Sequence, residues 1–141
     1  MNFIEFQKDG FVTSTDPSLL HINLIHNYLS NESYWAQGRS KRNVEKSIKN
    51  SLCFGVYKDV KQVGFARVVT DHAVFAYILD LFILPEYQGL GLGKWLMECI
   101  LAHPDLQEVK WGLSTKDAHG LYEKFGFRTL DDAEKWMKME R

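Results

Sequence analysis

The sequence predicts an α+β protein built around a mixed sheet. Its 141 residues fit one domain spanning 1–141, three strand-like runs follow one another mid-chain, and helix-like and strand-like segments alternate after them. An all-parallel, doubly wound sheet would need a helix between successive strands, which the middle of the chain does not offer. A mixed sheet is therefore expected.

The first third of the chain predicts one weak strand and two helices. A strand is expected over residues 3–8. Asp16 can cap a helix that starts with Pro17, and apolar residues at helical spacing extend this amphipathic helix over 17–29. Ser40 can cap a second, more polar helix that runs to about residue 50.

The middle of the chain predicts three strands. The apolar and aromatic run 52–58 and the Val- and Phe-rich run 62–70 are joined by the short link 59–61, which indicates a hairpin. A long apolar run over 73–84 follows. Pro85 ends it, because proline has no N–H group to donate to a ladder.

The last third predicts alternating helices and strands. A helix over 94–103 follows a glycine-rich loop and stops at Pro104. Gly126 suits the position just after a helix end. The remaining expected elements are a strand over 108–114, a short helix over 117–125, and two closing strands over 127–130 and 135–139.

Composition excludes several classes of function. A net charge of −1 argues against a nucleic-acid partner. No apolar run reaches the ~20 residues of a membrane span, and residues 1–8 lack the pattern of a signal peptide. Cys53 and Cys99 are far apart in the sequence and lack metal-ligand spacing, so we expect no metal site and a core position for each cysteine. A reducing, cytoplasmic setting is expected.

The loop Gln88-Gly89-Leu90-Gly91-Leu92-Gly93 indicates an anion site, because it joins the longest apolar strand to a helix N-terminus. A diphosphate group is the ligand we expect at such a site. A P-loop would need Ser or Thr after its lysine, but Trp95 follows Lys94. A dinucleotide fingerprint has glycines at relative positions one, three and six, whereas this loop has them at one, three and five.

The chain resembles the GNAT superfamily of N-acetyltransferases, and looks like a compact bacterial-type member. Gln88, Gly91 and Gly93 match the family signature of Gln or Arg, two residues, Gly, one residue, then Gly or Ala. A second match has Tyr122 followed by Gly126-Phe127. The resemblance implies a mostly antiparallel sheet of six to seven strands, splayed at a cofactor slot and flanked by about four helices.

The resemblance also implies acetyl-CoA as the acetyl donor. Its diphosphate would bind the backbone of Gln88, Gly89, Leu90, Gly91, Leu92, Gly93 and Lys94, and its pantetheine arm would pair with Phe82, Ile83 and Leu84. The two central strands would splay near Ile83 and Ser114. Thr115 stands where many members have Asn, which puts a pantetheine contact there in doubt.

The implied reaction is acetyl transfer to a primary amine by direct attack in a ternary complex. Backbone N–H groups of Ile83 or Leu84 would face the oxyanion, and Tyr122 would donate to the leaving sulfur. Asp80, the one charge inside its apolar strand, is either the general base or a structural carboxylate. Water is a third route for the amine proton.

The acceptor pocket is expected from Tyr34, Trp35, Arg39, Phe75 and Tyr77. Aromatic rings favour a small-molecule cationic amine, and Arg39 suggests that it also bears a carboxylate or phosphate. Tyr34 and Trp35 could equally cap the core. A protein acceptor, a non-catalytic acyl-CoA-binding module and a homodimer all stay open as alternatives.

Overall fold

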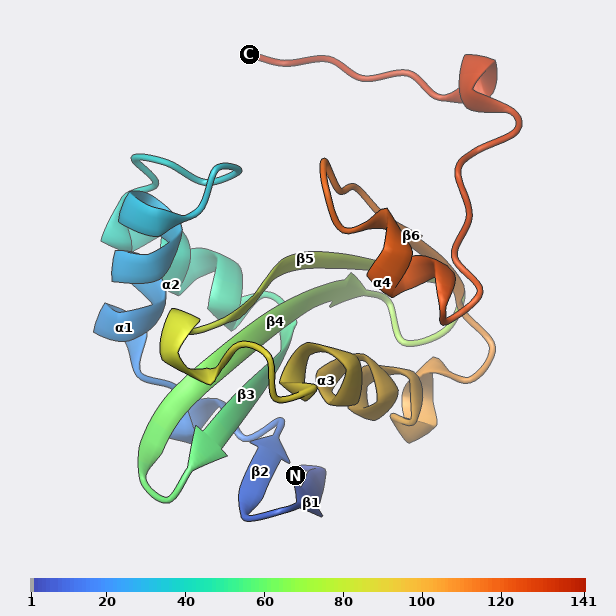
Figure 1. Ribbon diagram of the computed structural model, residues 1–141. Coiled ribbons are helices and arrows are strands. Elements are labelled where there is room, and N and C mark those ends of the chain that lie inside the picture. Colours follow the sequence, from blue (N-terminus) through green and yellow to red (C-terminus); the bar gives the residue numbers. More distant parts are fainter. Residues whose placement is uncertain (1) are drawn as a thin grey trace.

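The computed structural model describes residues 2–141, which contain one six-stranded sheet (Figure 1). The strand order follows the chain. The first four pairings are antiparallel and the last, between β5 and β6, is parallel. The strands are β1 (Glu5–Lys8), β2 (Phe11–Ser14), β3 (Leu52–Lys58), β4 (Lys61–Thr70), β5 (Phe75–Ile83) and β6 (Lys110–Leu113). The predicted mixed, mostly antiparallel sheet is confirmed.

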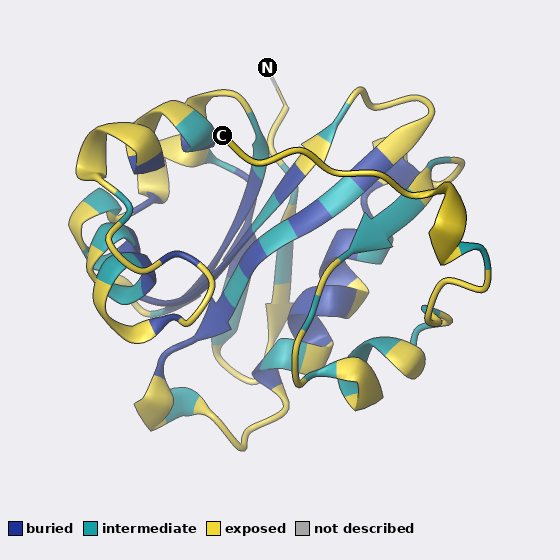
Figure 2. Ribbon diagram, turned by 90° about the horizontal axis from the view of Figure 1, so that it is seen from above, coloured by how far each residue is buried: buried dark blue, intermediate teal, exposed yellow. Residues whose placement is uncertain are grey.

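Helices cover both faces of the sheet. One pair lies on one face and the other pair on the opposite face (Figures 1 and 2). The first pair is α1 (Ile22–Asn27) and α2 (Lys41–Lys49), and the second is α3 (Leu92–Leu101) and α4 (His119–Glu123). None of these described helices is long and apolar enough to cross a membrane.

The sheet separates two apolar clusters, because successive side chains of a strand point to opposite faces. On β5, Phe82 packs with the α1–α2 cluster while Ile83 packs with the α3 cluster. The neighbours Phe65 and Ala66 of β4 divide in the same way, and both are fully buried. Burial on both faces explains why the central strands read as continuous apolar runs.

The expected helix over 17–29 is wrong as one element. Asp16 caps only a 3₁₀ turn (Pro17–Leu19), and Leu20 is extended, with φ −70° and ψ 135°. The N–H of His21 then donates to Oε1 of Gln62 at 2.8 Å, which anchors the chain to β4 before α1 begins. After α1 the chain widens into a π turn (Tyr28–Glu32). A tertiary contact therefore overrides the helical periodicity.

Other local predictions are confirmed. Ser40 caps α2 by accepting the N–H of Asn43, and Asp59, with φ +55°, helps to close the hairpin between β3 and β4. Gly126 follows α4 with φ +94°, as its place after a helix end predicted. Strand β2 was missed, because four residues are too few for a clear alternating pattern.

The two closing strands expected over 127–130 and 135–139 are wrong. Within the described chain the sheet ends at β6, and the residues after α4 form an irregular segment with one 3₁₀ turn (Ala133–Lys135). In Figure 1 this segment leaves the body of the molecule. An alternating pattern shows which side chains would share a face, but it does not provide a neighbouring strand.

Candidate active site

The site starts where β5 and β6 part. Their ladder joins only Phe75–Ile78 to Lys110–Leu113, and β5 continues to Ile83 without a partner on that edge. The N–H of Leu84 donates to Val63 of β4 at 2.8 Å. Because backbone groups alternate along a strand, those of Ile83 point away from β4 and into the gap.

Because of this alternation, the three residues expected to pair with pantetheine do not all turn their backbone groups toward the gap. Ile83 presents its backbone to the gap, and its carbonyl accepts a hydrogen bond from Nε2 of Gln88 at 2.9 Å. Phe82 pairs with Phe65, and the N–H of Leu84 is bonded to β4. Leu81, two residues before Ile83, also lines the cleft at this gap and was missed.

A β-bulge bends β5 at the same place. Phe65 pairs with Phe82 and Arg67 with Leu79, so Asp80 and Leu81 together face a single residue of β4. Asp80 has φ +57°, a left-handed conformation that is uncommon outside glycine. Bulges turn a strand locally, which explains how β5 leaves β6 while it stays paired with β4.

The glycine loop ends in the open N-terminus of α3. Gly89 and Gly91 have φ +84° and +79°, and Gly91 is the N-cap residue. The first backbone bond into the helix runs from Trp95 N–H to Gly91 at 3.0 Å, which leaves the N–H groups of Leu92, Gly93 and Lys94 without helical partners. A Cβ at any of the three glycines would meet no atom within 4 Å, so a ligand can reach this backbone.

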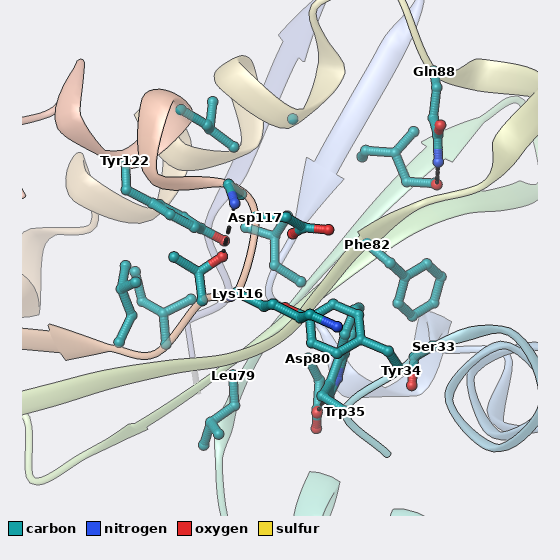
Figure 3. Close-up of a pocket in the computed structure, with 18 of the residues that line it drawn as sticks. Ser33, Tyr34, Trp35, Leu79, Asp80, Phe82, Gln88, Lys116, Asp117 and Tyr122 are labelled. Atoms are coloured by element: carbon teal, nitrogen blue, oxygen red, sulfur yellow. Dashed lines mark hydrogen bonds between the residues drawn. The ribbon is translucent and has the colours of Figure 1, made fainter. Parts of the chain in front are cut away.

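A cleft of about 1010 Å³ joins the loop to the gap between β5 and β6. Figure 3 shows its central part. Of the residues expected at the site, it is lined by Tyr34, Trp35, Arg39, Tyr77, Asp80, Phe82, Ile83, Gln88, Gly89, Gly91, Leu92, Gly93, Lys94, Thr115 and Tyr122. Phe75 pairs with Lys110 at the other end of β5 and does not line it, nor do Leu84 and Leu90.

Tyr122 enters the cleft from α4 and is half-buried (Figure 3). Burial raises the pKa of its phenol, with smaller contributions from Tyr34 and Asp117. The phenol is therefore protonated at neutral pH and able to donate a hydrogen bond. Just before α4, the Thr115 hydroxyl accepts the N–H of Ala118 at 3.0 Å, which orders the turn that leads into this helix.

Asp80 is the centre of a buried polar cluster. Its Oδ2 accepts from Arg39 at 2.8 Å and from Arg67 at 2.9 Å, and its Oδ1 accepts from the Trp35 indole at 3.0 Å. The Asp80 side chain is 1% exposed, whereas that of Arg39 is 24% exposed and lines the cleft. Two guanidinium groups share one carboxylate, so the cluster carries a net positive charge.

Tyr34 links two loops that are far apart in the sequence. Its hydroxyl accepts the backbone N–H of Lys116 at 3.0 Å, and the Lys116 ammonium lies 5.6 Å from its ring centroid. Its ring also meets Trp35 edge-on, with 5.1 Å between centroids. The α1–α2 connection is thereby joined to the β6–α4 loop across the cleft.

Several lining residues were not anticipated. Tyr28 stacks on Phe82, with ring centroids 4.0 Å apart, and its pKa is raised by burial and then by nearby Glu32. Glu32, Lys116 and Asp117 add charged groups to the walls. No spacing rule could have identified them, because they lie in a π turn and a loop that only the fold brings together.

Comparison with known proteins agrees with this geometry. The sequence model of the family described as the acetyltransferase (GNAT) domain matches residues 49–129 of this chain. A Gibberella zeae protein assigned to the acetyltransferases is 31% identical over 140 residues, which cover 83% of this chain and 78% of that protein.

Two solved structures extend the comparison. A GNAT-family protein from Xanthomonas campestris pv. campestris is 44% identical, with a TM-score of 0.92 over 96% of each chain. A Clostridium acetobutylicum acetyltransferase, solved with acetyl-CoA, shares the fold at 15% identity, with a TM-score of 0.67 over 99% of this chain and 95% of that one. The chain is thus a member of the GNAT acetyltransferase family.

Proposed function

We propose that this acetyltransferase moves the acetyl group of acetyl-CoA to the primary amine of a small molecule, by direct attack in a ternary complex. The observation that carries the proposal is the continuous path from the free edge of β5 to the open N-terminus of α3. Bound acetyl-CoA would supply the thioester that makes its acetyl group reactive. The chain's own residues bind it, orient it and place proton donors.

The backbone fits the donor at both ends of this path. Three unpaired N–H groups, from Leu92 to Lys94, and the positive end of the α3 dipole suit a diphosphate. The free edge of β5 at Ile83 suits the amides of a pantetheine arm, which would add to the sheet as a strand does. Lys94 is exposed beside this helix end and adds a positive charge.

Two groups are placed to assist the transfer. The N–H of Ile83 points into the gap and is a donor for the acetyl carbonyl oxygen, whereas the N–H of Leu84 is occupied by Val63. The protonated phenol of Tyr122 is a donor for the thiol sulfur. Catalysis would then rest on positioning and hydrogen bonding, without a covalent enzyme intermediate.

Asp80 fits a positioning role better than a general base. Both of its oxygens are already engaged, by Arg39 and Arg67 on one and by Trp35 on the other. These contacts hold two residues of the acceptor wall in place. We propose that water in the cleft accepts the amine proton.

The acceptor wall favours an amine that also carries an anionic group. The cluster around Asp80 has one positive charge in excess, and Arg39 is its member at the cleft. Only one of the five N–H donors of Arg39 is used in the described contacts. A carboxylate or phosphate on the acceptor would complete the charge balance, while Glu32 and the aromatic rings suit its amine end.

Thiol release from acetyl-CoA in the presence of an amine panel tests the reaction. We expect release with at least one amino acid, polyamine or aminoglycoside, and a Tyr122→Phe variant with kcat reduced roughly 100-fold. Acetyl-CoA affinity should change little, because the diphosphate site is untouched. Phe125→Leu, an aromatic substitution just after the end of α4 and outside the cleft, is the control. Stabilisation by acetyl-CoA without release for any amine would instead indicate a non-catalytic binding module.

The Asp80→Asn variant separates positioning from base catalysis. We expect the free energy of unfolding to fall by roughly 3 kcal/mol, because two arginines lose a buried partner. The acceptor KM should rise, while the pH–rate profile keeps its shape. Glu86→Gln, on the exposed pair with Lys61, is the control and should be near neutral. A lost pH dependence in Asp80→Asn would make Asp80 the base.

Arg39→Gln tests the anionic group of the acceptor. For an amine with a carboxylate, kcat/KM should fall about 10- to 100-fold, since a charged hydrogen bond is lost. For the same amine without the carboxylate the change should be under about threefold. Lys41→Gln removes an exposed positive charge nearby and should affect neither. An equal loss for both amines in Arg39→Gln would contradict recognition of the anion.

A further inference from the structure

Tyr34 connects two segments of the cleft wall, 28–40 and 114–118, that are far apart in the sequence. Its hydroxyl accepts the backbone N–H of Lys116, a residue 82 positions further along the chain. Among residues 2–141 this is the one hydrogen bond that joins the two segments. Figure 3 shows the Lys116 side chain extending toward Tyr34 and Trp35. A single hydroxyl group therefore makes the polar connection between the two segments.

Segment 114–118 lies on the donor side of the cleft. It follows β6 at the point where β5 and β6 part, and it leads into α4, which carries Tyr122. All of its residues line the cleft. The pKa of Tyr122 is raised by burial and then by Tyr34, so the two phenols lie near each other. A pantetheine arm in the gap would therefore lie against the segment that Tyr34 binds.

Segment 28–40 lies on the acceptor side. The Tyr34 ring meets Trp35 edge-on, with 5.1 Å between centroids. The Trp35 indole donates to Asp80, and the same carboxylate accepts from Arg39 at 2.8 Å. Contacts thus run from the donor segment, through Tyr34, to the arginine expected to bind the acceptor.

The bond between Tyr34 and Lys116 is weak enough for a ligand to shift. Tyr34 is 47% exposed, so water competes for its hydroxyl. A net hydrogen bond of ordinary strength favours the bonded arrangement by only about fivefold. Residues 33–40 and 114–118 form no helix or strand, so no regular hydrogen-bond ladder fixes their separation. A ligand that contacts the bonded arrangement better than the open one would increase its population.

We propose that Tyr34 is a positioning residue that couples the two ligands of the cleft. Acetyl-CoA lying against segment 114–118 favours the Tyr34–Lys116 bond, and this bond holds Trp35 and Arg39 in place for the acceptor. The inference rests on the proposed function, because it needs both ligands in this cleft. Coupling between two binding sites is reciprocal, so a bound acceptor also tightens acetyl-CoA. One hydrogen bond limits the effect to about fivefold.

Hydrogen exchange tests this link without an acceptor. Saturating acetyl-CoA should slow exchange at the amides of Ala36 and Gly38 by up to about fivefold. Both amides are bonded within segment 28–40 and neither residue lines the cleft, so direct contact with the ligand cannot explain the slowing. In Tyr34→Phe the slowing should disappear there but persist at Ile83.

The same experiment separates this inference from the proposed donor site. Slowing at Ile83 without slowing at Gly38, or the same slowing at Gly38 in Tyr34→Phe, would overturn the role of Tyr34 alone. No slowing at Ile83 in the wild type would overturn the donor site and the coupling together.

Steady-state kinetics with an accepted amine measures the coupling. The acceptor KM of the wild type should fall about fivefold as acetyl-CoA rises to saturation, and this dependence should vanish in Tyr34→Phe with little change in kcat. Tyr57→Phe is the matched control, since its hydroxyl is buried without a partner among the described residues and lies outside the cleft. An acceptor KM that is raised in Tyr34→Phe but still falls with acetyl-CoA would indicate direct contact with the acceptor and contradict coupling.

Discussion

The structure of the site depends on the point where β5 stops pairing with β6 but stays paired with β4. Up to Ile78 the strand has partners on both edges, and beyond it only on one. The bulge at Asp80 and Leu81 turns the strand at this point, and the Leu84–Val63 bond secures it again to β4. Gly64 permits the close approach there, because a Cβ at that position would meet Cδ1 of Ile83 at 2.7 Å. A free backbone edge is thereby kept inside a folded sheet by its pairing with β4.

The rest of the site is arranged around that free edge. At one end the chain passes through the glycine loop into α3, which presents unpaired N–H groups to an anion. At the other end, Asp80 lies in the bulge and its carboxylate hydrogen-bonds to Arg39 and Trp35 at the cleft wall. One local departure from regular strand geometry thus serves both the donor site and the acceptor wall. Such departures are common next to active sites.

Much of this could be predicted from local sequence. The strands β3 and β4, helix α2 with its Ser40 cap, and the glycine loop before α3 follow from patterns within a few residues. The broken helix near Leu20 could not be predicted, because its cause is Gln62, some forty residues further along. The partners of Asp80 also come from distant segments, so its engagement by two arginines was not apparent. The prediction of two closing strands was wrong because, among the described residues, these segments have no neighbouring strand to pair with.

Hydrogen exchange with and without acetyl-CoA tests the central claim most directly. If the donor lies along β5 and at the start of α3, saturating acetyl-CoA should slow exchange at the amides of Ile83 and of residues 91–94. The amide of Leu84, already bonded to Val63, and those of β2 and β3 should change little. Unchanged exchange at Ile83 and the α3 N-terminus, or protection confined to other surfaces, would contradict the account.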